Sequence, residues 1–232
     1  MDSDALRIVA IVPMRHSSER TPGKNYRSFA GRPLFHHIIG TLLGCPEIGE
    51  VVIDTDSALI REDARDQFPG VRVVERPSYL SAGEIPMNDV LLHTVSQVEA
   101  DLYLQTHSTN PLLLPSTISR AIRVFLDGQP ANDSLFSVKR IQARFWNDMG
   151  QSINHDPLKL MRTQDLAPVF EENSCIYLFS RKSLEAYGNR IGNKPMLFEM
   201  DPVESWDIDE EFDFQIAELL FLHRDKLKKS LP

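Results

Sequence analysis

The feature that most constrains the fold is an alternation of short apolar runs with segments of helical spacing. The first run, 5–13, reads ALRIVAIVP and is rich in β-branched residues. Such a run is typical of a strand buried on both faces, as in a parallel sheet that helices cover. Pro33 then suits the first turn of a helix, in which Leu34, Ile38 and Leu42 keep helical spacing.

The same pairing of strand and helix recurs along the chain. Further strands are expected at 50–54, 71–75, 102–105, 134–138, 176–179 and 196–200, and helices at about 58–68, 90–98, 117–126 and 210–222. Asp56-Ser57 and Ser116 are placed to cap two of these helices. Strand–helix alternation at this spacing predicts an α/β fold with a doubly wound, mostly parallel sheet.

Segment 139–172 breaks the alternation, because polar and aromatic residues mix there without a regular period. It predicts an inserted lobe or arm that covers one end of the sheet. A chain of 232 residues is long enough to bury about 70–75% of its unfolded surface. We therefore expect a single domain over 1–232, with the arm as its one large insertion.

Composition excludes several classes of function. The chain has 33 acidic against 25 basic residues, a net charge of -8, which is unsuited to general nucleic-acid binding. It has no apolar run of about 18 residues, and the acidic start, 1–4, lacks a basic leader region. Cys45 and Cys175 match no zinc or redox spacing, so each suits a buried thiol in a reducing compartment. We expect a cytoplasmic protein without a membrane partner.

The loop after the first strand, 15–25, carries three cations: Arg15, Arg20 and Lys24. Open α/β sheets bind ligands beyond the carboxyl ends of their strands, and this loop leaves such an end. Backbone amides with these cations would suit a polyphosphate. The loop matches neither a Walker A nor a G-x-G-x-x-G pattern, so a solvated charged loop is an equal alternative.

A second constellation lies near the C-terminus, at Asp207 and Asp209. On extended backbone the i, i+2 spacing points both carboxylates to the same side, where they would suit Mg²⁺. The alternative makes Asp209 the N-cap of the last helix. Asp54 and Asp56 share the spacing, although Asp56 is also placed to cap a helix.

Taken together, these segments resemble the cytidylyltransferases that activate sialic acids and related 3-deoxy-2-keto sugar acids. The matching stretches, in the order of that family, are P-M-R (13–15), P-G-K-N-Y-R (22–27), A-G-R-P-L (30–34), VVIDTD (51–56), Gln105 with Pro111-Leu112, DSLFSV (133–138), RTQDLAPVFEENSCIYLF (162–179) and WDIDEEFDF (206–214). They span nearly the whole chain. The resemblance implies the Rossmann-like fold of the nucleotide-diphospho-sugar transferases.

The resemblance also implies a reaction, in which an acidic sugar takes CMP from CTP and pyrophosphate is released. Arg15, Lys24 and Asp209 would be catalytic, and Asp207 and Asp209 would hold Mg²⁺. The nucleotide-binding residues would be Pro13, Met14, Arg15, Ser18, Arg20, Lys24 and Asn25. The residues facing the acidic acceptor would be Gln105, Arg162, Gln164 and Asn173, with the arm residues acting across the interface of a homodimer.

Departures from the family pattern fall in the phosphate-binding loop and on the acceptor side, and none falls on the carboxylate pair Asp207 and Asp209. His16-Ser17 stand where the family has glycines, and Glu19 stands where it has a lysine. The stretch 106–110 is two residues longer than usual, 84–87 lacks the usual small hydroxyl residues, and Asn-Gly becomes Asn173-Ser174. Two alternatives therefore stay open: a non-sugar acceptor such as a phosphonate, or a nucleotide-binding module without catalysis.

Overall fold

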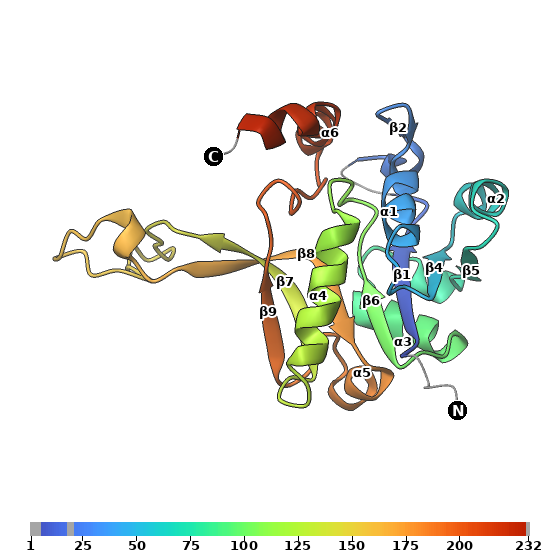
Figure 1. The fold of residues 1–232 in the computed structure, drawn as a ribbon, viewed down its shortest axis with the longest axis horizontal. Coiled ribbons are helices and arrows are strands. Elements are labelled where there is room, and N and C mark those ends of the chain that lie inside the picture. The colour runs from blue at the N-terminus through green and yellow to red at the C-terminus, as the bar shows by residue number, and fades with distance from the viewer. Residues whose placement is uncertain (1–5, 18–20, 231–232) are drawn as a thin grey trace.

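A seven-stranded sheet forms the centre of the protein (Figure 1). The computed structural model describes residues 6–17 and 21–230, with the side chains of 225–230 left out. The strands, in spatial order, are β5 (Arg72–Glu75), β4 (Glu50–Thr55), β1 (Ile8–Met14), β6 (Leu102–Gln105), β8 (Val169–Phe179), β7 (Ser134–Ile141) and β9 (Pro195–Glu199). Only the pairs that β8 makes with β6 and β7 are antiparallel. The predicted doubly wound, mostly parallel sheet is confirmed.

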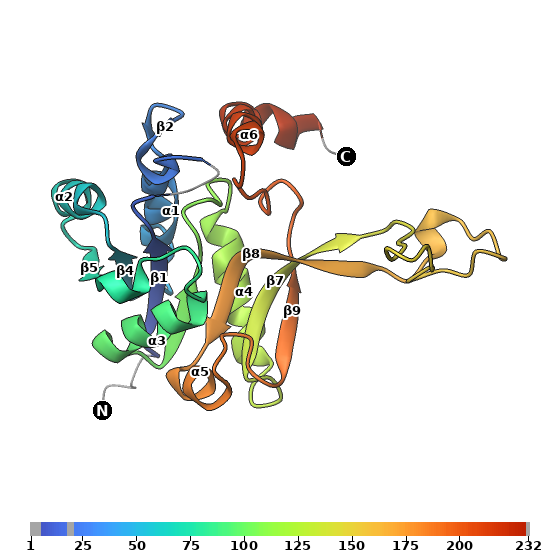
Figure 2. The ribbon, with the colours of Figure 1, turned by 180° about the vertical axis from the view of Figure 1, so that it is seen from behind.

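Helices cover both faces of the sheet. On one face lie α1 (Leu34–Leu43), α2 (Ala58–Gln67) and α4 (Pro115–Asp127), and on the other α3 (Met87–Gln97) and α5 (Arg181–Tyr187) (Figures 1 and 2). The sequence of β1 is continuously apolar because both faces of the strand are buried. Ala10 and Val12 pack in one core, and Val9 and Ile11 pack in the other. Successive side chains of a strand point to opposite faces, so a central strand between two helical layers needs apolar residues throughout.

A third, smaller core joins the C-terminal helix α6 (Glu211–Ser230) to the short hairpin of β2 (Ser28–Phe29) and β3 (Arg32–Pro33). Phe29, Phe214 and Ile208 are buried in it. Because Ile208 is anchored there, the residues on either side of it are held in place. No helix in the described part of the chain is long and apolar enough to cross a membrane.

Helix starts differ from the predicted ones by a few residues. Helix α4 begins at Pro115 and its N-cap is Leu114, so Ser116 lies inside the first turn rather than capping it. Proline at the first helical position, with its fixed φ, sets this boundary. Helix α3 likewise begins at Met87, after Pro86. At α2 the cap is Ser57, whose hydroxyl accepts a hydrogen bond from the Ile60 amide.

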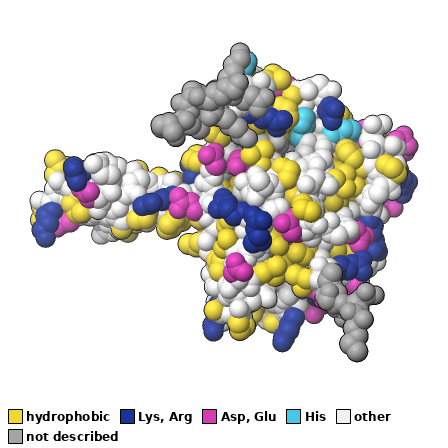
Figure 3. All heavy atoms as spheres, in the orientation of Figure 1, with side chains coloured by type: hydrophobic (Ala, Val, Ile, Leu, Met, Phe, Trp, Pro, Cys, Tyr) yellow, Lys and Arg dark blue, Asp and Glu magenta, His cyan; other side chains and the backbone are white. Residues whose placement is uncertain are grey.

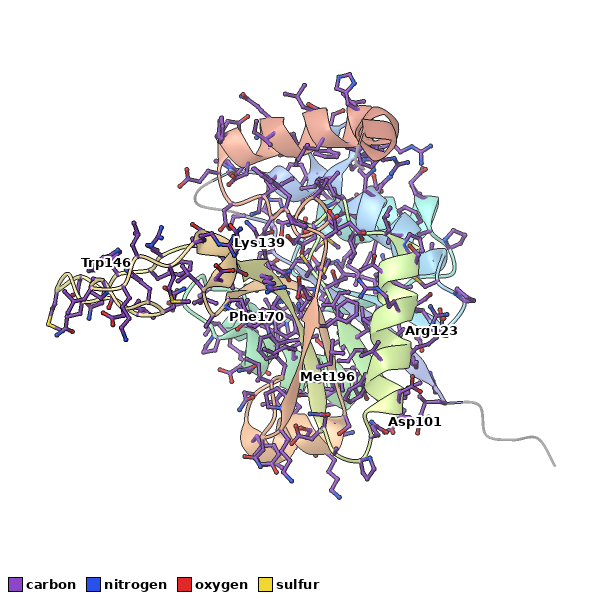
Figure 4. The ribbon with its side chains drawn as sticks, turned by 60° about the vertical axis from the view of Figure 1, so that its left-hand side comes forward. Asp101, Arg123, Lys139, Trp146, Phe170 and Met196 are labelled. Carbon is purple, nitrogen blue, oxygen red and sulfur yellow. The ribbon has the colours of Figure 1, made fainter. Side chains whose placement is uncertain are left out.

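The irregular segment is an extension of two sheet strands. Strands β7 and β8 stay paired from Val138↔Glu172 to Ile141↔Val169, and 142–168 form the end of the arm. In Figure 4 Lys139 and Phe170 lie near its base and Trp146 far along it. The arm projects away from the sheet rather than covering one end of it, because the strand pairing continues outward past the core (Figure 1).

Candidate active site

A cleft of about 800 Å³ opens beyond the carboxyl ends of the parallel strands, where such folds place their ligands. It brings together most of the residues that the sequence singled out, with several that it did not. The lining residues are Pro13, Met14, Arg15, Ser17, Lys24, Asn25, Arg76, Gly83, Glu84, Met87, His107, Ser108, Thr109, Ser174, Arg190, Asp207 and Asp209. Ser18 and Arg20, two of the predicted nucleotide-binding residues, lie outside the described residues.

The loop after β1 is shaped by a tight turn. Gly23 has φ +66, and a Cβ on it would lie 2.8 Å from the ring of Tyr26, so the turn favours glycine. Asn25 then holds the loop: its Nδ2 donates to the Arg15 carbonyl at 2.9 Å, and its Oδ1 accepts from the Ser108 hydroxyl at 2.7 Å. Asn25 therefore positions the backbone that carries Arg15.

His16 has a local structural role in this loop. Its backbone amide donates to Asp56 Oδ1 at 2.8 Å, and its Nδ1 lies 2.9 Å from the Ser57 hydroxyl. The imidazole also stacks on Tyr26, with ring centroids 5.8 Å apart. Asp56 thus anchors the loop, which gives this acid a role other than metal binding or helix capping.

The cationic loop is tied directly to the carboxylate pair. Lys24 Nζ donates to the carbonyl of Ile208 at 2.7 Å, and the Thr21 hydroxyl donates to the carbonyl of Asp209 at 3.1 Å. Both contacts use backbone oxygens, so they fix the position of segment 207–209 relative to the loop. Cation and carboxylates therefore face one cleft although they are about 180 residues apart in sequence.

Asp207 and Asp209 lie on the same side of their segment, as the i, i+2 spacing predicts. Ile208 between them is fully buried, while both carboxylates line the cleft. Burial raises the pKa of Asp207; a hydrogen bond from Thr109 opposes this shift and the neighbouring Asp209 adds to it. A second negative charge here is thus unfavourable without a cation.

The donor set fits Mg²⁺ bound together with a ligand. Within the part of the chain that the structure describes, no group of three or more His, Cys, Asp or Glu side chains is arranged to hold a metal. Two hard carboxylate oxygens are the number that a Mg²⁺ site normally takes from protein when phosphates complete its shell. A site built for a metal alone would need more protein ligands.

Arg76 is a cleft residue that no motif of the sequence singled out. It follows β5 directly and is 3% exposed; its Nε donates to Asp54 Oδ1 at 2.5 Å, and Asp54 is fully buried. The Thr94 hydroxyl donates to the other Asp54 oxygen at 2.8 Å. Asp54 therefore orients Arg76 and belongs to no metal pair. The rule that ligands gather at strand ends would have pointed to Arg76.

Arg190, on the loop after α5, is a further cation that lines the cleft, besides Arg15, Lys24 and Arg76. Its NH1 donates to Gln105 Oε1 at 2.6 Å, and its guanidinium carbon lies 3.6 Å from the ring centroid of Tyr177. The Gln105 amide nitrogen lies 2.9 Å from His107 Nε2. Gln105 is fully buried and touches the cleft through these neighbours. No sequence signal marks Arg190, because only the fold brings its loop to β6.

His107 is expected to make stability fall in mild acid. Burial, helped by the nearby charges of Arg190 and Lys24, lowers its pKa to about 3 from a usual 6.5. The unfolded chain therefore binds more protons between pH 6.5 and 3, so this contribution is present above pH 6.5 and is lost as the pH falls. Lowering the pH from 6.5 to 5 should cost about 1.5 kcal/mol through this residue.

Urea denaturation of the wild type and of His107→Gln at pH 6.5 and pH 5 measures this contribution. The variant should lose about 1.5 kcal/mol less than the wild type over that interval. Parallel losses in the two proteins would contradict the assigned pKa.

The remaining predicted acceptor residues lie outside the cleft of their own chain. Arg162 and Gln164 are on the arm, where Arg162 pairs with Asp165 at 2.7 Å and keeps 73% of its side chain exposed. Asn173 is buried at the base of the arm, and its Oδ1 accepts from the Ser137 hydroxyl and the Cys175 amide. It lines a smaller neighbouring cavity that shares Asp207 and Asp209 with the main cleft.

The fold and the cleft first define a class: an α/β protein that presents a cationic loop and a carboxylate pair to one nucleotide-sized cavity. A family model described as cytidylyltransferase matches residues 9–227. The chain belongs to the cytidylyltransferase family, as the resemblance in its sequence indicated.

Individual relatives agree with this assignment. The chain is 28% identical to N-acylneuraminate cytidylyltransferase A of Danio rerio, over 97% of this chain and 53% of that one. It is 27% identical to the CMP-N,N'-diacetyllegionaminic acid synthase of Legionella pneumophila, over 93% and 96%. The chain thus spans about half the length of several of the curated relatives it matches, and nearly all of the Legionella one.

Solved structures share the fold. The structure of CMP:2-keto-3-deoxy-manno-octonic acid synthetase complexed with CTP matches with a TM-score of 0.72 at 18% identity, covering 94% of this chain and 99% of that one. A 4-diphosphocytidyl-2C-methyl-D-erythritol synthase from Anaerococcus prevotii matches with a TM-score of 0.69 at 12% identity, covering 94% and 97%. These matches confirm the Rossmann-like fold type.

Proposed function

We propose that this protein transfers CMP from CTP to an acidic 2-keto-3-deoxy sugar and releases pyrophosphate. One observation carries the proposal: the cleft joins the cations of the β1 loop to the Asp207–Asp209 pair through the bond from Lys24 to Ile208. The family membership and the names of the relatives support the same chemistry. A hydroxyl oxygen of the acceptor would bond to the α-phosphorus as the bond to the pyrophosphate oxygen breaks, and the hydroxyl proton would pass to solvent.

The residues of the cleft suit a reaction that depends on positioning and charge neutralisation. Arg15 and Lys24 would bind the triphosphate, and Arg76, fixed by Asp54, would add a rigid guanidinium. Asp207 and Asp209 would hold Mg²⁺. When bound, the ion would neutralise charge on the phosphates. Burial raises the pKa of Asp207 because it penalises the charged carboxylate, and a bound cation would offset that penalty.

Pyrophosphate release tests the function. The purified protein with Mg²⁺ is given each of the four nucleoside triphosphates, against 2-keto-3-deoxy sugar acids and small phosphonates. Release with CTP and a sugar acid alone is the expected result. Turnover only with a phosphonate, or CTP binding without turnover of any acceptor, would overturn the proposed acceptor or the proposed catalysis, respectively.

We further propose that the arm makes a homodimer. Apolar side chains lie on the surface of the arm (Figure 3). Among its residues, Leu158 and Leu160 are each 93% exposed. Exposed apolar surface of this extent marks an interaction site. We infer that the arm packs against a second copy of this chain. Arg162 and Gln164 lie away from the cleft of their own chain, and such a dimer would bring them to the cleft of the partner, where the acceptor would bind.

Charging the arm should separate the dimer. Leu158→Glu combined with Leu160→Glu is expected to shift the protein from dimer to monomer in analytical ultracentrifugation, since two buried charges oppose association. The matched control is Leu219→Glu combined with Leu222→Glu on α6, which are also exposed and should leave the dimer intact. A dimer that survives in the arm variant, or dissociates equally in the control, contradicts the assignment.

A further inference from the structure

Arg190 is held by the fold in one orientation at the acceptor end of the cleft. Its backbone amide lies 3.3 Å from Asn88 Oδ1, and Asn189 Oδ1 accepts from the amides of Ile191 and Gly192 at 2.9 and 2.8 Å. The guanidinium stacks on Tyr177 and keeps 15% of its side chain exposed, toward the cleft. A loop and an aromatic ring thus fix this cation before any ligand arrives.

The contact with Arg190 fixes which atom of the Gln105 side-chain amide accepts and which donates hydrogen bonds. Arginine can only donate, so Gln105 Oε1 accepts from it and Gln105 Nε2 must be the donor to its neighbours. That nitrogen reaches the Thr106 carbonyl at 3.2 Å and His107 Nε2 at 2.9 Å. His107 Nε2 therefore carries a lone pair, and the proton of this neutral imidazole sits on Nδ1.

This ordering changes which groups can meet the acceptor. Both N–H groups of the Gln105 amide are engaged, and its oxygen already accepts from Arg190. Arg190 and His107 both line the cleft, and the groups that Gln105 leaves unengaged on them, the other guanidinium N–H groups and the Nδ1–H, are donors. A surface of donors fits a group that only accepts.

The charge of Arg190 also lacks a close counter-ion. The nearest carboxylate oxygen, Glu172 Oε1, is 4.0 Å away and already accepts the hydroxyl of Tyr177. A largely buried cation without a close anion is costly, which favours an anionic ligand. Ser174 beside it adds polarity: its φ of 57 is one that glycine adopts freely, and its hydroxyl oxygen lies 3.2 Å from the Tyr177 hydroxyl, whose single proton goes to Glu172.

We propose that Arg190, with His107, binds an oxyanion of the acceptor, and that Gln105 is a positioning residue that holds both. The inference deepens the proposed function and rests on it, because the ligand is the acceptor of that same site. The oxyanion is either the carboxylate of the sugar acid or a second anionic substituent further along the acceptor. An acceptor with only neutral or cationic groups at this end should bind poorly.

The test compares acceptors that differ in one charge. Binding of the best sugar acid and of its methyl ester is measured by calorimetry with Mg²⁺ and a non-hydrolysable CTP analogue, in wild type, Arg190→Gln and Arg123→Gln. Arg123 is an exposed arginine on α4 and serves as the matched control. In wild type and control the acid should bind at least about 30-fold tighter than the ester.

Arg190→Gln should reduce that preference to less than about threefold while affinity for the CTP analogue stays unchanged. If the preference survives, the same cycle with a sugar acid bearing a phosphate and its dephosphorylated form identifies a second substituent as the oxyanion. Arg190→Gln indistinguishable from wild type in both cycles overturns the proposal. Gln105→Leu should raise the KM for the acceptor and leave the KM for CTP unchanged.

Two further measurements keep the inference separate from the proposed function. His107→Gln should lose part of the preference for the acid over its methyl ester. This variant tests the same site if Arg190→Gln does not fold. If no sugar acid binds the wild type, the proposed function fails. Inorganic phosphate added to CTP-loaded protein then tests whether Arg190 binds an oxyanion. Phosphate should raise the Tm of wild type and Arg123→Gln but not of Arg190→Gln; an equal rise in all three overturns the site.

Discussion

Replacing Asp209 with asparagine is expected to lower turnover at least about 100-fold, the usual cost of losing one transition-state charge contact. The carboxylate lines the cleft beside Asp207, and its backbone carbonyl is held by Thr21. Asparagine keeps the shape but cannot hold Mg²⁺ against the phosphates as a carboxylate does. Pyrophosphate release at several Mg²⁺ concentrations measures the effect, and the Mg²⁺ requirement should rise with the loss of rate.

The matched control is Glu210→Gln, which removes the charge of the next residue in the chain. Glu210 is exposed and directly precedes α6, so loss of its charge should change turnover less than about twofold. Thermal unfolding of both variants checks that the fold is intact. If Asp209→Asn turned over at the wild-type rate, the carboxylate pair would have no part in catalysis.

Replacing Arg76 with methionine is expected to destabilise the protein by about 3–5 kcal/mol. The side chains of Arg76 and Asp54 are 1% and 0% exposed and lie 2.5 Å apart, so the change leaves a carboxylate buried without its cation. The Thr94 hydroxyl, which donates to the same carboxylate, cannot compensate for a whole charge. Equilibrium urea denaturation measures the loss.

Two comparisons isolate the cause. Adding Asp54→Asn to Arg76→Met should restore part of the stability, because no buried charge then remains. Arg61→Met breaks the pair of Arg61 with the 70% exposed Glu75 and should cost less than about 1 kcal/mol. If Arg76→Met and Arg61→Met lowered the free energy of unfolding equally, the buried pair would contribute no more to stability than the exposed pair. CTP should bind more weakly only to the variants that lack Arg76.

Much of this site is readable from local sequence. The loop residues Arg15 and Lys24 follow a strand whose apolar run identifies it as central, and strand ends are where such sheets bind ligands. Asp207 and Asp209 flank an isoleucine, and burying that isoleucine turns both carboxylates the same way. In each case neighbouring residues contain the physical reason.

Other parts of the site have no local signature. Arg190 reaches the cleft only because β8 pairs with β6, which brings the loop after α5 to Gln105. The same spacing of acids that forms a pair at 207–209 does not do so at Asp54, because Arg76 takes that carboxylate from an adjacent strand. These outcomes depend on contacts between residues far apart in sequence.

By itself, the sequence determined the layered sheet, the cationic loop and the carboxylate pair, since periodicity and burial act over a few residues. The tertiary structure alone decided which charges are neutralised and which face the cleft. A carboxylate beside a buried arginine and one beside a buried isoleucine look alike in sequence. They differ because a charge is stabilised or penalised by whatever the fold packs within a few ångströms of it.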